Sequence, residues 1–283
     1  MIQPTKEDVL QALINSGYDI IAGWAPLADN PHEFIKKFIY EIARNELLVL
    51  TNEFSIDIPR YIHPISAIKK YRSIMCNVLV YSCPGEVKPS IHKNNEIELR
   101  HWKCRYHKKC AKYEIPICIR SYGLGYAIDI MSNGKFSKIN KLNFSNDGKC
   151  SSILEVNYVG NLLEIPQDEV VIDERTQKIM TREQAVDFGI KAWIMGIESA
   201  VDKLLPEHTV EVLSKAFSAI GSEDMNEEEM EVIDLYIGAP ISRWTKGLCV
   251  YSPKAELNDK DEIGKTELSN KKDEENVVEN PEK

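Results

Sequence analysis

Residues 181–205 read TREQAVDFGIKAWIMGIESAVDKLL, and this stretch predicts one long, buried helix. Thr181 and Gln184 stand three residues apart, the spacing of a capping box in which two side chains satisfy free backbone N–H groups at the start of a helix. Apolar residues then recur at helical spacing as far as Leu205, and Pro206 breaks the pattern. The expected helix therefore runs from about residue 182 to residue 205.

Small residues recur along the same stripe over residues 185–200, namely Ala185, Gly189, Ala192, Gly196 and Ala200. A glycine inside a helix costs up to about 1 kcal/mol relative to alanine, and the close approach of another helix offsets that cost. The neighbour is either a helix of the same chain or a second subunit. In the second case, residues 185–200 form a surface for self-association or for a protein partner.

The chain beyond this helix predicts a further helical region and then a charged tail. One helix begins after Pro206, and another spans residues 227–237. Residues 254–283 contain ten acidic and six basic residues, a net charge of −4, and few residues that could build a core. We therefore expect a helical region over 181–252 and a disordered acidic tail over 253–283.

Residues 1–82 predict a mainly helical region with two short strands. Thr5 with Asp8 is a capping box, and Ser16-Gly17 and Asn45 are signals that end a helix. The expected elements are three helices, over about residues 5–17, over about residues 30–45 and from Pro64 onward, and two buried strands at residues 47–50 and 77–81.

Residues 83–180 predict an antiparallel sheet. Asn133-Gly134 lies between two apolar stretches, and this dipeptide suits a type I′ turn because both central residues of that turn need positive φ. The expected strands are residues 97–106 with a phase slip near Arg100, 115–120, 126–131, 135–142 and 153–159, followed by a second hairpin of residues 169–172 and 178–180. Such a meander of five to seven strands, flanked by helices, gives an α+β fold.

The composition is that of an ordinary globular chain. Its 283 residues are 43% hydrophobic and 28% charged, with a net charge of −9 and a mean hydropathy of −0.31. These values exclude a collagen-like, a fully disordered and a multi-span membrane protein, and no stretch reaches the roughly 18 apolar residues of a spanning helix. Seven cysteines without a secretory signal favour a cytoplasmic location and no membrane partner.

The charge is distributed unevenly, because residues 92–113 form a basic segment. It contains seven basic and two acidic residues, with aromatic residues between them. Lysine and arginine neutralise phosphates, and aromatic rings stack on bases, so the segment predicts contact with nucleic acid. His101 and His107 would add charge below about pH 6.5. The candidate contact residues are Arg100, Trp102, Lys103, Arg105, Tyr106, Lys108, Lys109 and Lys112.

Two alternatives apply to this basic segment. It is either a solvated basic face, or a surface that pairs with the acidic tail of the same chain. In the second case, the tail would compete with nucleic acid for the segment.

Residues 101–110 read HWKCRYHKKC, which places His and Cys at every third position. Zinc needs four nitrogen or sulfur ligands that converge tetrahedrally, and only a loop or turn would bring this spacing together. A mixed zinc site would use Cys83, Cys104, His107 and Cys110. The alternative is a strand that buries Trp102, Cys104 and Tyr106 while its basic residues and histidines face water.

Enzyme signatures are sparse. Asp57 and the later triplet Glu86, Val87 and Lys88 have the order of a metal-dependent nuclease, in which two carboxylates on adjacent strands hold Mg²⁺ and a lysine positions water. Pro84-Gly85 interrupts the strand that this geometry needs. The phosphate-binding glycine loops, the G-x-S-x-G elbow and the H-E-x-x-H zinc motif do not occur in the sequence.

These observations favour a non-enzymatic nucleic-acid-associated or regulatory protein that acts through residues 92–113. Its Ile-, Asn- and Lys-rich composition is compatible with a viral or mobile-element origin. The alternative is a structural or assembly protein that uses the C-terminal helices and the acidic tail. An enzyme without a recognisable motif, such as the nuclease above, is the third hypothesis.

Overall fold

The computed structural model describes residues 5–78, 87–93, 95–102, 104, 106–113, 115, 117–145, 149–169 and 180–218. Within these residues the fold is α+β, as expected. The second predicted hairpin beyond residue 169, the helix at 227–237 and the tail at 253–283 lie outside the described residues.

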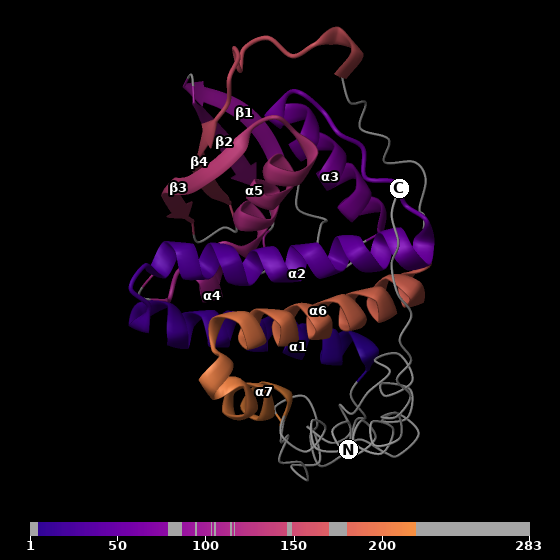
Figure 1. Cartoon of the computed structure of the whole chain (residues 1–283), viewed down its shortest axis with the longest axis vertical. Helices are drawn as coiled ribbons and strands as arrows, with labels where there is room; N and C mark the ends of the chain where they lie inside the picture. The colour runs from indigo at the N-terminus through magenta and orange to yellow at the C-terminus, as the bar shows by residue number, and fades with distance from the viewer. Residues whose placement is uncertain are drawn as a thin grey trace, which may run out of the picture. The chain divides into compact units, whose positions relative to one another are not determined.

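Figure 1 shows the arrangement of the described helices and strands. The α-helices are α1 (Lys6–Trp24), α2 (Pro31–Phe54), α3 (Pro64–Val78), α4 (His107–Cys110), α5 (Ile119–Met131), α6 (Arg182–Leu204) and α7 (Thr209–Ser218). The short 3₁₀ helices are η1 (Ala25–Leu27), η2 (Gln167–Glu169) and η3 (Pro206–His208). The strands are β1 (Val87–Lys93), β2 (Glu96–His101), β3 (Lys135–Phe144) and β4 (Cys150–Asn157).

Helix α6 confirms the prediction made from residues 181–205. Thr181 and Gln184 form the expected capping box. Its apolar stripe is covered by α1 and α2 of the same chain (Figure 1). A Cβ built on Gly196 would lie only 2.6 Å from the Cα of Ile42 in α2, so this glycine permits a close approach within the chain. The buried face of residues 185–200 is therefore occupied and does not offer a surface to a second subunit.

Helices α1 and α2 are longer than the sequence predicted. Ser16-Gly17 does not end α1, because Gly17 is where the ring of Trp193 packs, 2.9 Å from the position of a Cβ. Asn45 does not end α2, since its side-chain amide donates a hydrogen bond to the carbonyl of Glu41 within the helix. The predicted strand at residues 47–50 is wrong, because these residues continue α2, with Leu47, Val49 and Leu50 in the core and Leu48 exposed.

Helix α5 replaces two predicted strands. Residues 119–131 are helical, which rules out the strand at 126–131 and the last two residues of the strand at 115–120, whose other described residues form no strand. Asn133-Gly134 therefore joins a helix to β3 rather than two strands. Apolar residues lie on nearly all sides of α5, which hides the helical period in the sequence. The helix predicted from Pro64 is confirmed as α3, and it includes Asn77 and Val78 of the expected strand at 77–81, whose other residues are outside the described ranges.

The sheet is antiparallel throughout, in the order β1-β2-β4-β3. Two hairpins, β1–β2 and β3–β4, are joined by pairing of β2 with β4, so the described sheet has four strands and not the order of a simple meander. The strands predicted at 135–142 and 153–159 correspond to β3 and β4. The strand predicted over 97–106 ends at His101, and the chain then leaves the sheet.

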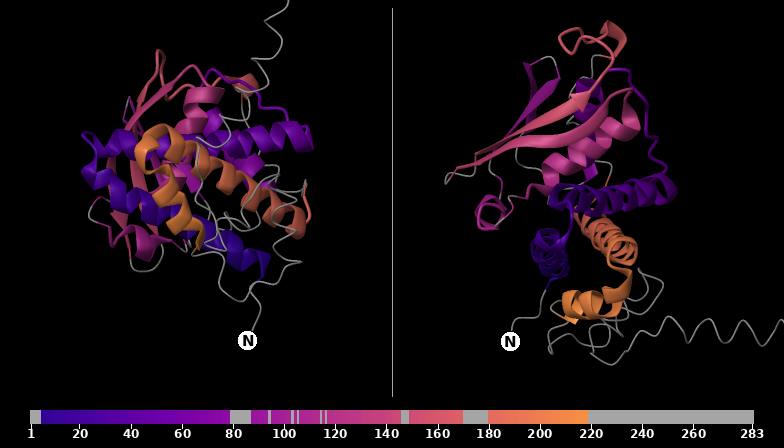
Figure 2. Two further views of the ribbon diagram at one scale, coloured as in Figure 1. Left: turned by 60° about the horizontal axis from the view of Figure 1, so that its bottom comes forward. Right: turned by 60° about the vertical axis from the view of Figure 1, so that its left-hand side comes forward.

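The helices form layers on one side of the sheet. Helices α3 and α5 lie against it, α2 runs beneath them, and α1 and α6 pack on the far side of α2, with α7 beyond (Figures 1 and 2). One hydrophobic cluster includes buried residues of all these layers, such as Phe38 of α2, Tyr122 of α5 and Leu154 of β4. The N-terminal helices and the sheet therefore share one core.

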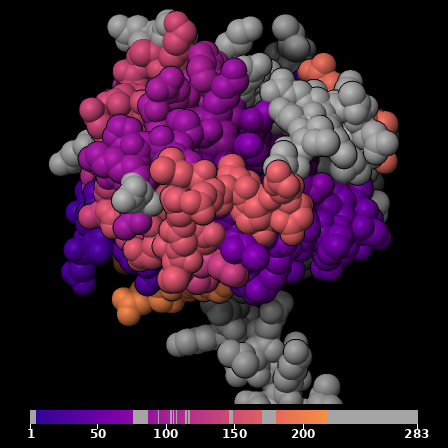
Figure 3. Space-filling model, turned by 90° about the horizontal axis from the view of Figure 1, so that it is seen from above, coloured from indigo at the N-terminus to yellow at the C-terminus, as the bar shows by residue number. Residues whose placement is uncertain are grey.

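The segment after β4 packs back onto the link between α2 and α3. The carboxylate of Glu169 accepts hydrogen bonds from the backbone N–H groups of Ile62 and His63, and the His63 ring lies 3.0 Å from the carbonyl of Leu162. Figure 3 shows this segment (salmon) across the face seen from above. None of the helices in the described part of the chain is both long and apolar enough to cross a membrane.

Candidate functional site

The basic segment 92–113 divides in the structure between the sheet and helix α1. Its first half runs through β2, where Ile97, Leu99 and His101 point toward the helices while Glu98 and Arg100 point to the other face of the sheet. Its second half leaves the sheet and ends in α4, next to α1. Lys103 and Arg105 of the predicted contact set lie outside the described residues.

Two cations and one aromatic ring lie together at the open end of the β1–β2 hairpin, away from its turn. They belong to Lys88, Arg100 and Trp102. Lys88 stands directly opposite Arg100 in the strand pairing, and its Nζ lies 5.4 Å from the ring centroid of Trp102. The Arg100 side chain is 59% exposed and lies 2.9 Å from a carboxylate oxygen of Glu98. The site thus combines a half-buried aromatic ring with two cations on the face of the sheet that α3 and α5 do not cover.

Tyr106 and Lys109 instead hold α4 against α1. The hydroxyl of Tyr106 donates a hydrogen bond to Gln11, and its ring packs against Tyr18, with the centroids 5.6 Å apart. The ammonium group of Lys109 lies 2.9 Å from a carboxylate oxygen of Asp19. These two members of the predicted contact set therefore have contacts within the protein, whereas Lys108 and Lys112 are exposed.

His101 corrects one expectation about charge. The residue is 2% exposed, and burial, with a smaller effect of Arg120, lowers the pKa of its ring to about 3. Its Nε2 lies 3.2 Å from the hydroxyl of Ser121, which in turn lies 2.7 Å from that of Ser152. His101 therefore stays neutral at pH 6 and adds no positive charge to the basic segment.

The predicted zinc ligands are only partly described. Cys104 and Cys110 are buried thiols, while Cys83 and the side chain of His107 lie outside the described residues. Among the side chains that are described, no three His, Cys, Asp or Glu residues converge as metal ligands. The alternative strand through residue 106 is wrong because β2 ends at His101, although Cys104 is buried as that reading expected.

The nuclease arrangement does not form around Asp57. This residue is exposed in the link between α2 and α3 and belongs to no strand, so it has no strand position beside β1. Glu86 lies outside the described residues.

Sequence reasoning missed the basic residues of β3. Lys138 and Lys141 alternate with inward-facing residues on this edge strand, and both are exposed. Lys138 lies 3.6 Å from a carboxylate oxygen of Glu155 on β4. The alternation within residues 135–142 is visible in the sequence. That these lysines lie on the same face of the sheet as Arg100 follows only from the pairing of β4 with both β2 and β3.

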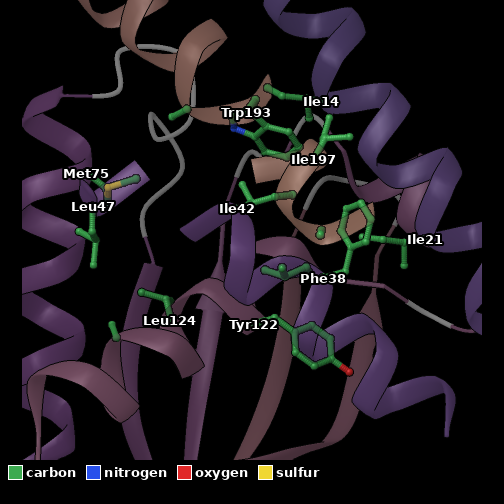
Figure 4. Packing of buried hydrophobic residues seen from close by; sticks show 14 of the residues in the cluster. Ile14, Ile21, Phe38, Ile42, Leu47, Met75, Tyr122, Leu124, Trp193 and Ile197 are labelled. Carbon is green, nitrogen blue, oxygen red and sulfur yellow. The ribbon is translucent and has the colours of Figure 1, made fainter. Parts of the chain in front are cut away.

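Sequence reasoning also missed a cavity of about 120 Å³ among the helical layers. Helices α1, α2, α3, α5 and α6 all contribute to its lining, which is mostly apolar. Figure 4 shows Ile42, Met75, Leu124 and Trp193, which belong to this lining.

Glu46 is the acidic residue that lines this cavity. It lies inside α2 and is 8% exposed, and the side chains of Trp193 and Tyr71 act on its carboxyl as hydrogen-bond donors. Burial raises the pKa of its carboxyl to about 7, although these hydrogen bonds act in the opposite direction. A buried carboxyl with a raised pKa beside a cavity is a recognised mark of a binding or catalytic site.

Comparisons with protein-family models, with curated proteins and with solved structures found no match for this chain.

Proposed function

We propose that this chain is a non-enzymatic nucleic-acid-binding protein with a regulatory role. Its contact surface would be the end of the β1–β2 hairpin together with α4. The observation that supports this most directly is the grouping of Lys88, Arg100 and Trp102 on the face of the sheet away from the helices. Cations beside an aromatic ring suit a single strand, whose phosphates and unpaired bases are both accessible.

The structure narrows the set of contact residues. Arg100, Trp102, Lys108 and Lys112 remain candidates because each is exposed or half-buried. Tyr106 and Lys109 are left out because they fasten α4 to α1. The four cysteines that the structure describes are buried thiols, which supports the expected cytoplasmic location.

Replacing Arg100, Lys108 and Lys112 together by alanine is expected to weaken binding of a fluorescent single-stranded oligonucleotide at least about tenfold at low salt. Each lost cation removes one phosphate contact, so the slope of log Kd against log salt should fall by about 2. Fluorescence anisotropy at several salt concentrations measures both quantities.

The matched control replaces Arg60, Lys37 and Lys203, which are also one arginine and two lysines, are exposed, and lie on the link after α2, on α2 and on α6. It should bind as the unmodified protein does. Equal losses in the two triple variants would show that only net charge matters, and no binding at low salt by the unmodified protein would end the proposal.

The acidic residues 254–283 supply the proposed regulation. Removing them is expected to tighten oligonucleotide binding several-fold at low salt, because a tethered acidic segment competes for the same cations. The difference should vanish at high salt, where the competition is screened. The comparison uses the same anisotropy titration, and unchanged affinity at low salt would contradict the competition.

A further inference from the structure

The cavity among the helical layers is lined by a glycine that leaves room for a side chain. Gly123 lies inside α5 and lines the cavity, and a Cβ built on it would meet no atom within 4 Å. Gly17 and Gly196 are also inside helices, but there a neighbouring helix leaves no room for a side chain. No neighbour requires a glycine at position 123, so what sets this position apart is the open space in front of it.

Four aromatic side chains contribute to the walls of the cavity that Glu46 lines. Tyr18 of α1, Tyr71 of α3, Tyr106 and Trp193 of α6 all contribute to the lining. The faces of such rings carry partial negative charge and attract cations, above all where water is excluded. A buried carboxyl in a cavity whose lining includes four aromatic rings is thus chemically matched to an organic cation.

The two basic residues of the lining act elsewhere. Arg72 donates a hydrogen bond to the carbonyl of Val87 at the start of β1. The positive charge of Arg120 contributes to the lowered pKa of His101 in β2. Both are half-buried, so water reaches them. Only burial and the hydrogen bonds from Trp193 and Tyr71 affect the titration of Glu46, and neither guanidinium contributes.

We propose that this cavity binds a small molecule that consists of an apolar body and one ammonium group, and that Glu46 is the carboxylate that pairs with the ammonium. Cavities only slightly larger than this one accommodate a single six-membered ring. A primary amine with one ring or a short chain has the matching charge and is close to this size. This inference does not depend on the proposed binding of nucleic acid.

Three probes that share one ring separate the contributions of charge and shape. Cyclohexylamine, cyclohexanol and cyclohexanecarboxylate are titrated into the full chain at pH 7.5, with binding followed by calorimetry or by tryptophan fluorescence. The amine is expected to bind at least about tenfold more tightly than the alcohol, because the carboxyl of Glu46 is buried and its ion pair with the ammonium group is only weakly screened by water. The carboxylate is expected to bind more weakly than the alcohol.

Glu46→Gln tests the residue assignment. Glutamine retains an oxygen that accepts the hydrogen bonds from Trp193 and Tyr71 but has no charge. The variant should bind the amine at least about tenfold more weakly and should bind the alcohol as before. A purely structural role of Glu46 would leave the preference for the amine unchanged.

Gly123→Met provides a second variant that does not alter Glu46. A side chain at this position would extend into the cavity and should abolish binding of both the amine and the alcohol. Gly23→Met is the matched control, since a Cβ there also meets nothing within 4 Å but Gly23 is not part of the lining. It should bind all probes as the unmodified protein does.

Three results would overturn the inference. The first is tighter binding of the carboxylate than of the amine, which would assign the site to Arg72 and Arg120. The second is an unchanged preference for the amine in Glu46→Gln, and the third is that none of the three probes binds.

Discussion

The unmodified protein is expected to lose about 3 kcal/mol of its free energy of unfolding between pH 4 and pH 8, and the variant Glu46→Gln is expected to keep it. The carboxyl of Glu46 has its ordinary pKa near 4.5 in the unfolded chain, and burial raises this pKa to about 7 in the folded protein. Below pH 4 the group is protonated in both states and does not affect stability. Between these two pKa values only the unfolded state releases its proton, so rising pH favours unfolding by about 1.4 kcal/mol per unit.

Glutamine does not titrate, so the variant should lack this loss. Urea denaturation at pH 4, 6 and 8 measures the loss as the difference in the free energy of unfolding between Glu46→Gln and the unmodified protein. Glu198→Gln is the informative control, because burial and then the nearby Asp202 raise the pKa of Glu198 to about 7 as well. In the double variant Glu46→Gln with Glu198→Gln, the two changes in the free energy of unfolding should add, because neither carboxyl affects the pKa of the other.

Parallel stability curves for the unmodified protein and Glu46→Gln would show that Glu46 titrates normally. If the loss is present, it also bears on the cavity. A chain that keeps an ionisable carboxyl in an apolar interior loses stability at neutral pH, and a bound ammonium group would restore that stability by supplying the missing opposite charge.

Local signals predicted the parts of the fold that depend on local contacts. Both capping boxes, Thr5 with Asp8 and Thr181 with Gln184, form as the sequence indicates because each joins groups only three residues apart. The apolar residues of α6 recur at helical spacing, so the sequence also predicts this helix.

Predictions failed where distant residues override local preference. Gly17 is a helix-ending signal in isolation, yet in the fold it makes room for Trp193, which is 176 positions away in the chain. Helix α5 is buried on nearly all sides, so its residues show neither a helical nor an alternating pattern. The same physics explains the site: His101 lies in a basic stretch, but the packing of α5 against the sheet buries its ring, and burial keeps it neutral.

The cavity left almost no signal in the sequence. Its lining comes from five helices, from Val87 of β1 and from Tyr106, so it depends on residues that are far apart in the chain. Glu46 reads as an ordinary surface residue of an amphipathic helix until α3 and α6 are placed on either side of it. The one hint available was the position of Glu46 directly before the apolar run of residues 47–50.

Gly196→Ala is expected to lower the free energy of unfolding by about 2 to 3 kcal/mol. The added methyl group would lie 2.6 Å from the Cα of Ile42, and real Cβ atoms do not approach a backbone so closely. Two helices that pack along their length would have to separate, and such overpacking typically costs about 1 to 3 kcal/mol. That cost exceeds the gain of up to about 1 kcal/mol that alanine brings to a helix.

Gly123→Ala is the matched control for this comparison, because it makes the same substitution inside a helix where nothing lies within 4 Å. Only the gain in helix propensity remains there, so stability should rise by about 1 kcal/mol. Urea denaturation of both variants gives the two changes with opposite signs. If Gly196→Ala instead stabilised the protein, α2 and α6 would not be packed as closely as the structure places them, and residues 185–200 would again be open to a second subunit.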